Sequence, residues 1–460
     1  MPTLGPRVVI AGTHSGVGKT TIATGLMAAF RARGWQVGAA KVGPDFIDTG
    51  YHSLASGRSS RNLDPWMCGM DAMAPLAGRA GDGCDLLVVE GVMGLFDGAA
   101  DGTPSSTAEV ALALAAPVVL VVDAASASTS VAATIHGFAT FDPRIQLAGV
   151  ILNRVGSDSH ESMLRTAISP LGIPVLGVLR RDPELVWRDR HLGLIPVIER
   201  PSEVAASLRR LASRIDGSCD LEEIMAIARR SPTTQTIAPA VPEPVGEARI
   251  AVVAGPAFSF CYPDNLEALG AAGAELMSFD PCADERLPDG CTGLLAGGGF
   301  PEVYTEALSQ NVALLADVHR RVADGLAVWA ECGGLLWLCR SLDDRKLAGV
   351  IDAEALMSER LTLGYRQAVA RTDTPIGPVG TEVRGHEYHY SRVETPGSAL
   401  ALTGREGPSQ AGFASDRLLA SYLHVHLGAR PDLAEQFVRT CTSGFSSSGN
   451  GHALRLPYLS

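Results

Sequence analysis

The chain has 460 residues, which at roughly 150 residues per domain predicts two or three domains and excludes a small scaffold that depends on disulfides. Its 38 basic and 50 acidic residues give a net charge of −12, so the chain has no overall positive field to hold nucleic acid. The longest apolar run, from Val110 to Val122, contains Pro117 and is too short to cross a membrane.

The cysteine and lysine contents narrow the class of protein further. Nine cysteines are spread along the chain without a Cys-x-x-Cys pair, which argues against a disulfide framework and a structural zinc site. The dispersed cysteines suit a reducing compartment, so we predict a cytoplasmic location. The first twelve residues lack a basic segment followed by a long apolar one, so we also predict no signal peptide. Only three of the 38 basic residues are lysines, and Lys19 and Lys41 lie near the start. We expect that the chemistry of a functional site requires a compact ammonium group at these two positions.

In the first half of the chain, short β-branched runs alternate with longer segments at helical spacing. Buried strands are predicted at residues 7–11, 36–41, 85–90, 117–123, 147–153 and 174–179. Strands separated by helices indicate a parallel, doubly wound α/β sheet. We therefore predict a first α/β domain over residues 1–230.

The composition changes at residue 231. Residues 231–244 contain four prolines and little that could be buried, so we predict a linker over 231–247. After it the pattern resumes, with strands at 249–254, 293–296 and 326–330 and helices from about Asp264 and after Tyr304. A second α/β domain is therefore predicted over residues 248–460.

A glycine-rich segment lies between the first predicted strand and a predicted helix, which is the context that a phosphate-binding loop requires. Its glycines allow backbone N–H groups to approach phosphates, Lys19 would reach the β- and γ-phosphates, and the Thr20 hydroxyl would bind Mg²⁺. The leading glycine is Gly12 rather than residue 13, so the loop is one residue longer than the strict pattern. The alternative is a glycine-rich turn without a ligand. The residues expected to bind ATP here are Gly16, Val17, Gly18, Lys19, Thr20 and Thr21.

Carboxylates follow two other predicted strands, at the edge where open α/β sheets bind ligands. Asp45, Glu90 and Asp97 are candidates to hold Mg²⁺ or to position a substrate. The alternative for each is a helix cap or a pair with an arginine. Asn153 ends a further strand, where its amide could read a nucleotide base or form a turn.

In the second domain, a cysteine followed by two glycines lies between two apolar segments, within residues 327–338. A strand that turns sharply through Cys332 into a helix is typical of a nucleophile elbow. The backbone amide of Gly333 could face an oxyanion, and the loop containing Gly298 and Gly299 could supply a second donor. The alternative is a small, buried and inert cysteine.

A nucleophilic cysteine needs a base, and four clustered histidines are available. His386 and His389 lie in one segment, and His424 and His426 in another. Alternate residues of a strand face opposite sides, so only one of His424 and His426 can point toward the sulfur. No His-Glu-x-x-His helix is present, which makes a zinc site an unfavoured interpretation.

One domain that cleaves a phosphoanhydride and one that attacks an amide combine most economically as an ATP-driven amide ligase. The segment from Gly12 to Thr20 resembles the loop of dethiobiotin-synthetase-like ATPases, which implies a P-loop NTPase-like fold for the first domain. Residues 331–334 resemble a class I glutamine amidotransferase of flavodoxin-like fold. Together with residues 41–48, 90–98 and 385–391, they are similar to cobyrinic or hydrogenobyrinic acid a,c-diamide synthases.

The resemblance implies amidation of two acetate groups of a corrin-type macrocycle, using glutamine and ATP with Mg²⁺, and a homodimer. It implies that ATP binding includes Lys41 and Asn153, that Thr20, Asp45 and Glu90 hold the metal, and that Asp45, Asp48 and Asp97 serve the substrate. Most class I amidotransferases carry Glu two residues after the catalytic histidine, where this chain has His426. We therefore expect a dyad of Cys332 and His424.

Other interpretations stay open. Cobyric acid synthase is the nearest alternative family, and CTP synthase also joins a related ATPase to an amidotransferase. A nucleotide-dependent switch of the partitioning-ATPase type would need a second lysine early in the loop or a membrane-binding tail, and the sequence offers neither.

Overall fold

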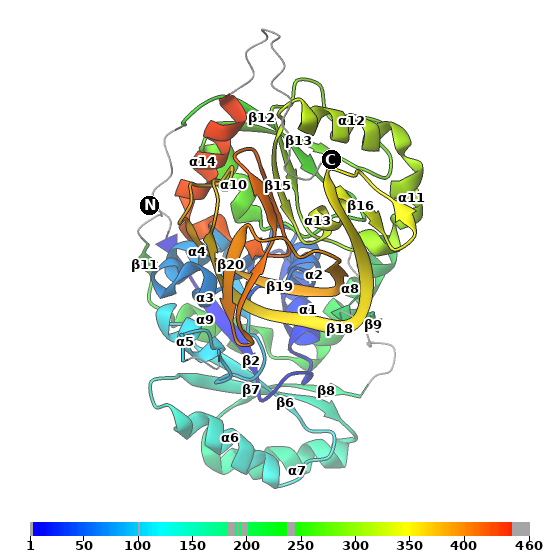
Figure 1. Ribbon diagram of the computed structural model, residues 1–460. Coiled ribbons are helices and arrows are strands. Elements are labelled where there is room, and N and C mark those ends of the chain that lie inside the picture. Colours follow the sequence, from blue (N-terminus) through cyan, green and yellow to red (C-terminus); the bar gives the residue numbers. More distant parts are fainter. Residues whose placement is uncertain are drawn as a thin grey trace. The chain divides into compact units, whose positions relative to one another are not determined.

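The computed structural model describes residues 3–99, 102–181, 189–190, 193–194, 201–236 and 244–443 (Figure 1). The chain divides into two compact units, Met1–Pro239 and Ala240–Ser460. This division falls inside the predicted linker, but the first residues of that segment belong to the first unit. There β11 (Thr234–Gln235) pairs with β1 (Thr3–Leu4), and the Ser231 hydroxyl donates to the Arg7 carbonyl.

The first unit contains a seven-stranded parallel sheet in the order β4-β3-β5-β2-β6-β7-β8. Its strands are β2 (Arg7–Gly12), β3 (Val37–Val42), β4 (Arg61–Leu63), β5 (Leu86–Glu90), β6 (Val118–Asp123), β7 (Leu147–Val155) and β8 (Val175–Arg180). All six predicted strands are confirmed, and β4 is an addition. A separate pair is formed by β9 (Asp189–Arg190) and β10 (Gly193–Leu194).

Helices cover this sheet, as the uninterrupted apolar character of its strands requires. Val8, Val9 and Ile10 of β2 are fully buried, which is expected for a parallel strand enclosed on both faces. Helix α1 packs on β2, β3 and β5 and on α8, and Figure 1 shows α6 and α7 side by side. The helices are α1 (Lys19–Ala32), α2 (Ile47–Ser56), α3 (Pro65–Cys68), α4 (Met73–Ala80), α5 (Thr107–Ala113), α6 (Ser130–Phe141), α7 (Asp158–Ile168), α8 (Pro201–Ser218) and α9 (Leu221–Arg229), with 3-10 turns η1 (Met70–Ala72) and η2 (Ser169–Leu171).

The second unit has a central sheet in the order β13-β12-β14-β15-β23-β22, parallel except for β22. The five parallel strands follow the 2-1-3-4-5 order of flavodoxin-like folds, as predicted. The strands are β12 (Ala248–Val253), β13 (Ala274–Phe279), β14 (Gly293–Ala296), β15 (Ala327–Glu331), β22 (Phe413–Ser415) and β23 (Leu418–Ser421). The helices are α10 (Pro263–Ala271), α11 (Thr305–Gln310), α12 (Val312–Ala323), α13 (Gly333–Leu338) and α14 (Pro431–Thr442), with 3-10 turns η5 (Pro301–Val303) and η6 (Leu427–Ala429).

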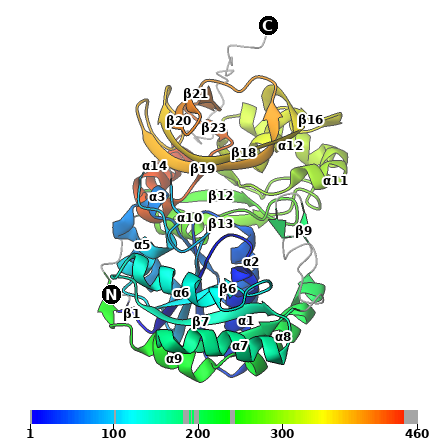
Figure 2. The same ribbon diagram turned by 90° about the horizontal axis from the view of Figure 1, so that it is seen from below.

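A second, mostly antiparallel sheet in this unit was not predicted. Its long strands β18 (Ile351–Ala370) and β19 (Glu382–Val393) form the curved ribbons that Figure 2 shows. Short strand β24 (His424–Val425) pairs with β19, and the register places His424 opposite His386. The remaining strands are β16 (Cys339–Leu342), β17 (Arg345–Lys346), β20 (Leu400–Gly404) and β21 (Gly407–Ala411). The sheet thus brings two histidine-containing segments together.

Each face of the central sheet in the second unit carries its own core. Val328 and Ala330 of β15 pack on one face with α12 and α13, and Ala327 and Trp329 pack on the other with α14. The Trp329 ring meets Phe437 edge-on, with ring centroids 5.7 Å apart. The strand that leads to Cys332 is therefore anchored in apolar cores on both faces.

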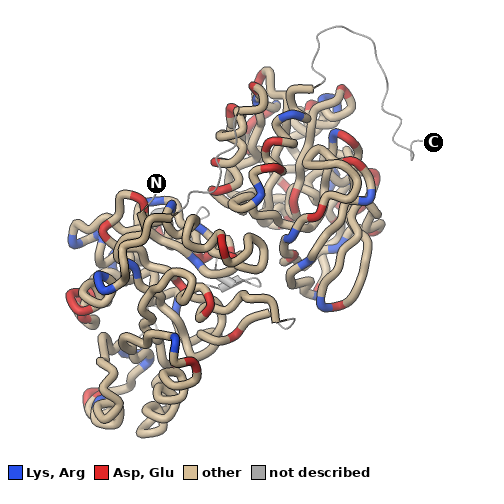
Figure 3. Tube along the Cα trace, turned by 90° about the vertical axis from the view of Figure 1, so that its left-hand side faces the viewer, with Lys and Arg blue, Asp and Glu red and all other residues tan. Residues whose placement is uncertain are grey.

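Positive and negative residues are not separated from one another along the described parts of the chain. Basic and acidic residues are interspersed along both units (Figure 3). Among the residues that the structure describes, no helix is long and apolar enough to span a bilayer.

Packing around Trp329 gives a test of the second core. Phe437→Ala should lower the free energy of unfolding by about 3–5 kcal/mol, because it removes a fully buried ring and leaves a cavity. Phe141→Ala makes the same chemical change at a side chain that is 75% exposed and should cost under about 1 kcal/mol. Urea unfolding followed by circular dichroism measures both values. Equal losses would contradict the assignment of Phe437 to the core.

Candidate functional site

The predicted phosphate loop wraps closely around its own lysine. A Cβ at Gly12 would lie 2.7 Å from Val17 and 2.9 Å from the Lys19 side chain, so a glycine is required where Lys19 passes. Gly18 has φ 99°, and a Cβ there would lie 2.3 Å from the Asn153 amide nitrogen. That nitrogen donates to the Val17 carbonyl at 2.8 Å, so Asn153 holds the loop in place. Its predicted role in reading a base stays a prediction.

Lys19, Thr20 and Thr21 form the first turn of α1, whose N–H groups have no acceptor within the helix. The Lys19 ammonium donates to the His14 carbonyl at 3.2 Å, across the loop. Gly16, with φ 82°, belongs to the same loop. The geometry is that of an anion site at a helix N-terminus, to which Lys19 adds a positive charge.

Side chains at or after the carboxyl ends of β2, β3 and β5 meet beside this turn. The Thr20 hydroxyl donates to Glu90 at 2.7 Å and lies 3.4 Å from an Asp48 carboxylate oxygen. Buried Lys41 donates to the Gly91 carbonyl at 2.9 Å and lies 3.6 Å from Asp48 and 3.7 Å from Glu90. Oxygen donors of this kind suit Mg²⁺, which is commonly held by one or two carboxylates with phosphates and water. Thr20, Asp48 and Glu90 fit that ion.

Two of the predicted site carboxylates also accept backbone hydrogen bonds. The Asp45 carboxylate accepts the Asp48 N–H at 2.7 Å at the start of α2, so it holds the turn that presents Asp48. Asp48 rather than Asp45 lies beside Thr20, so Asp48 is the better placed of the two for a cation bound there, and metal binding by Asp45 stays a prediction. Asp97 accepts the Gly94 N–H at 2.8 Å within its own loop. Substrate contacts by Asp45, Asp48 and Asp97 stay predictions.

Sequence reasoning missed His52. Its Nε2 lies 2.6 Å from Glu90, and both side chains are buried. Because an ionised carboxylate only accepts hydrogen bonds, Nε2–H is the donor. The signal in the sequence is the spacing from Asp48 to His52, which places both on one face of α2.

Burial and neighbouring charges shift the pKa values of several groups in this site. Burial opposes ionisation of Glu90, but Lys41 and His52 outweigh it and lower the pKa of Glu90 to about 2. Burial and the Asp45 and Glu90 carboxylates raise the pKa of Asp48 well above its usual value. Burial and the Lys41 ammonium lower the pKa of Lys19 to about 8. A bound cation would relieve the repulsion among the carboxylates, and a phosphate would relieve the repulsion between the two ammonium groups.

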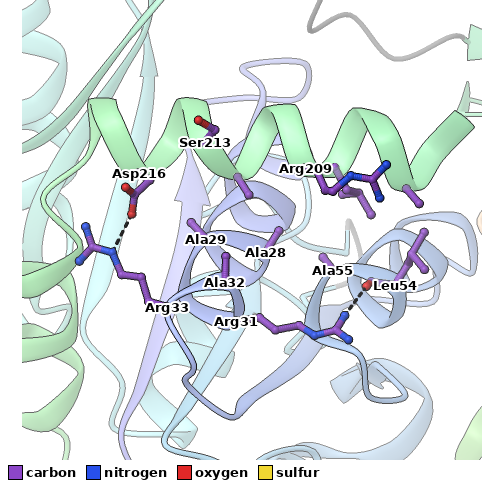
Figure 4. A pocket seen from close by; sticks show the side chains of 13 residues that line it. Ala28, Ala29, Arg31, Ala32, Arg33, Leu54, Ala55, Arg209, Ser213 and Asp216 are labelled. Atoms are coloured by element: carbon purple, nitrogen blue, oxygen red, sulfur yellow. Dashed lines mark hydrogen bonds and ion pairs between the residues drawn. The ribbon is translucent and has the colours of Figure 1, made fainter.

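A cavity of about 580 Å³ lies elsewhere in the first unit, between α1, α2 and α8 (Figure 4). Alanines form much of its wall, while Arg33 pairs with Asp216 at 2.6 Å and Arg31 donates to the Leu54 carbonyl. No residue predicted for the site lines it.

Cys332 lies where β15 turns into α13. Its φ of 48° is a left-handed conformation, which non-glycine residues rarely adopt, and it fits a strained elbow. A Cβ at Gly334 would lie 2.2 Å from the Ala296 carbonyl oxygen, so the turn must lack a side chain to pack against β14. The predicted strand, elbow and helix are all present.

His424 is the histidine that meets the sulfur. It hydrogen-bonds Cys332, and its Nδ1 lies 3.5 Å from Glu331. Burial alone would lower the pKa of His424, but the contacts with Cys332 and Glu331 raise it to about 10. His426 instead packs on Tyr262 and lies 3.8 Å from Asp264. The two histidines face different neighbours, as strand alternation predicts.

The candidate oxyanion donors divide into two groups. The Gly298 N–H donates to the Phe260 carbonyl at 3.0 Å, so Gly298 does not fit the predicted donor role. A glycine is still needed at residue 298 to leave room for His424, because a Cβ there would lie 2.5 Å from the His424 ring. Gly333 lies close to Gly299, whose nitrogen would be 3.1 Å from a Cβ at residue 333. Gly299 and Gly333 remain candidates.

Protein-family matches divide the chain in the same way as the structure does, with one family for each unit. Residues 8–194 match the CobQ/CobB/MinD/ParA nucleotide binding domain, and residues 249–432 match the CobB/CobQ-like glutamine amidotransferase domain. The fold and the sites thus define an amidating enzyme in which a P-loop nucleotide-binding domain is joined to a glutamine amidotransferase domain.

Similarity over almost the full length defines the group more closely. The chain is 47% identical to the hydrogenobyrinate a,c-diamide synthase of Streptomyces coelicolor, over 95% of this chain and 97% of that protein. It is 41% identical to the cobyrinate a,c-diamide synthase of Dehalococcoides mccartyi, over 94% and 98% of the two chains. The chain belongs to the a,c-diamide synthase family.

The position of Lys19 predicts how nucleotide binding depends on pH. Its pKa of about 8 means that the ammonium loses its proton, and its attraction for phosphate, as the pH rises through 8. The affinity for a non-hydrolysable ATP analogue should therefore fall roughly tenfold between pH 7 and pH 9. Fluorescence titration measures it, and the residual binding of Lys19→Ala should not change in this range. An equally flat profile for the unchanged protein would contradict the role of Lys19.

Proposed function

We propose that this protein is a glutamine-hydrolysing ligase that uses ATP to amidate the a and c acetate carboxylates of hydrogenobyrinic acid or cobyrinic acid. The observation that carries the proposal is the Cys332–His424 elbow in a chain that also holds the Lys19 loop. The names of its relatives supply the class of substrate.

In the amidotransferase unit, His424 would take the thiol proton of Cys332. The thiolate would then attack the side-chain carbonyl of glutamine and form a carbon–sulfur bond. As the carbon–nitrogen bond breaks, the imidazolium returns the proton to the leaving ammonia. Water then cleaves the thioester, which releases glutamate and restores the thiol. Backbone N–H groups at Gly299 and Gly333 would stabilise the oxyanion.

In the nucleotide-binding unit, a substrate carboxylate oxygen would attack the γ-phosphorus of ATP, and ADP would leave. Ammonia would attack the acyl carbon of the resulting acyl phosphate, and inorganic phosphate would leave. Lys19 and the first turn of α1 would hold the phosphates, and buried Lys41 would orient Asp48 and Glu90. Mg²⁺ held by Thr20, Asp48 and Glu90 would neutralise phosphate charge.

The cysteine content bears on where the protein acts. Nine free cysteines suit a reducing compartment, which supports a cytoplasmic location. We also expect a homodimer, as the family resemblance implies.

Product analysis tests the substrate. Purified protein incubated with ATP, Mg²⁺ and glutamine should convert two carboxylates to amides on hydrogenobyrinic acid or on cobyrinic acid, as detected by mass spectrometry. Parallel incubations with the two acids decide whether the macrocycle carries cobalt. Hydrolysis of ATP without an amide on either acid would overturn the substrate assignment.

Two variants should separate the sites. Cys332→Ser should reduce glutamine-dependent amidation by at least about 1000-fold and leave amidation from added ammonium salts within about threefold, because only the ammonia source is lost. Lys19→Arg should lose both reactions by more than about 100-fold, because a planar guanidinium does not replace a compact ammonium. The measurement is the initial rate of amide formation with each nitrogen source. Loss of both reactions in Cys332→Ser would contradict the two-site mechanism.

A further inference from the structure

The residue that precedes the nucleophile is a buried acid with no catalytic role assigned so far. Glu331 is the last residue of β15 and is 5% exposed. A buried carboxylate is costly unless its charge and lone pairs have partners. Its surroundings therefore indicate what it does.

The two oxygens of Glu331 have different partners on the same segment. Oε1 accepts the Val425 N–H at 3.2 Å, and Oε2 lies 3.5 Å from His424 Nδ1. The carboxylate thus accepts a hydrogen bond from the backbone that follows the histidine and faces one nitrogen of its ring. With Nδ1 facing Glu331, Nε2 is the nitrogen left to exchange a proton with Cys332.

The other titratable groups near His424 are either paired with another side chain or kept neutral by burial. Glu387 of β19 pairs with Arg366 of β18 at 2.9 Å. His386 lies opposite His424 on β19, with ring centroids 5.0 Å apart, and burial lowers its pKa well below its usual value. His389, also of β19, stacks on Tyr422. Among the ion pairs of the described residues, His424 is the cation that faces Glu331.

We propose that Glu331 is the positioning carboxylate of His424, supplied by the strand before the nucleophile rather than from two residues after the histidine. There the chain has His426, which contacts Tyr262 and Asp264. The expected dyad thereby becomes a triad in which Glu331 and Cys332 are consecutive residues. Glu331 fixes the ring orientation and stabilises the imidazolium, as an acid does in other triads. This inference rests on the proposed glutaminase reaction.

Glu331→Gln is the decisive variant, because its amide oxygen can still accept the Val425 N–H while the charge is lost. We expect kcat for glutamine hydrolysis to fall about 10- to 100-fold, with KM changed less than about threefold. The alkaline limb of the kcat profile should move to lower pH, because the imidazolium loses its proton sooner. Glu331→Asp, which keeps the charge, should recover part of kcat.

Controls separate positioning from simple structural support. Asp264→Asn removes a buried carboxylate beside the other histidine and should leave the pH profile unchanged. Alkylation of Cys332 by iodoacetamide across the pH range reports the thiolate without turnover, and thermal unfolding checks that each variant is folded. Amidation from ammonium salts should persist in Glu331→Gln.

Two outcomes would overturn the proposal: an unchanged kcat and pH profile in Glu331→Gln, or a lower kcat with an unshifted profile that Glu331→Asp does not improve. The parallel Cys332→Ser variant distinguishes the two levels. If it keeps glutaminase activity, the proposed function itself fails. If it loses that activity while Glu331→Gln does not, only the role of Glu331 fails.

Discussion

Both candidate sites depend on a buried parallel strand that ends in a turn too close to its neighbours for an ordinary side chain. In the first unit, Gly12 leaves room for Lys19, and Gly18 leaves room for Asn153. In the second, Gly334 packs against the Ala296 carbonyl, and Gly298 admits the His424 ring. Reactive side chains can be held rigidly at such turns because the strands behind them are locked in apolar cores.

The sequence predicts most consequences of this constraint. Apolar runs locate the parallel strands, and glycines next to Lys19 and Cys332 mark the turns. Position at a strand end does not determine which carboxylate reaches a ligand. Asp45 and Asp48 lie in the same motif, and the direction of α2 decides that Asp48 lies beside Thr20 while Asp45 accepts a backbone N–H. His52 emerges only once α2 places it beside Glu90, at the end of β5.

The second sheet of the amidotransferase unit shows where sequence reasoning fails. Strand β18 begins with alternating buried and exposed residues, a period that predicts a half-exposed strand. The period does not predict which strand pairs with it, because a pairing partner can lie far away along the chain. The pairing of β19 with β24 brings His386 and His424 together and defines the surroundings of the histidine. Strand alternation separates His424 from His426 in the sequence, and the three-dimensional pairing identifies the one that meets Cys332.

The scarcity of lysine has a physical explanation in the first site. Lys41 is buried, and its ammonium lies within 3.7 Å of the Gly91 carbonyl, Asp48 and Glu90. A compact ammonium can donate in three directions from one point, whereas a guanidinium is a flat fork of greater size. Lys19 is also confined, because its stem lies against Gly12. Arginine can supply positive charge on the surface, but these two positions require a small cation at the end of a narrow stem.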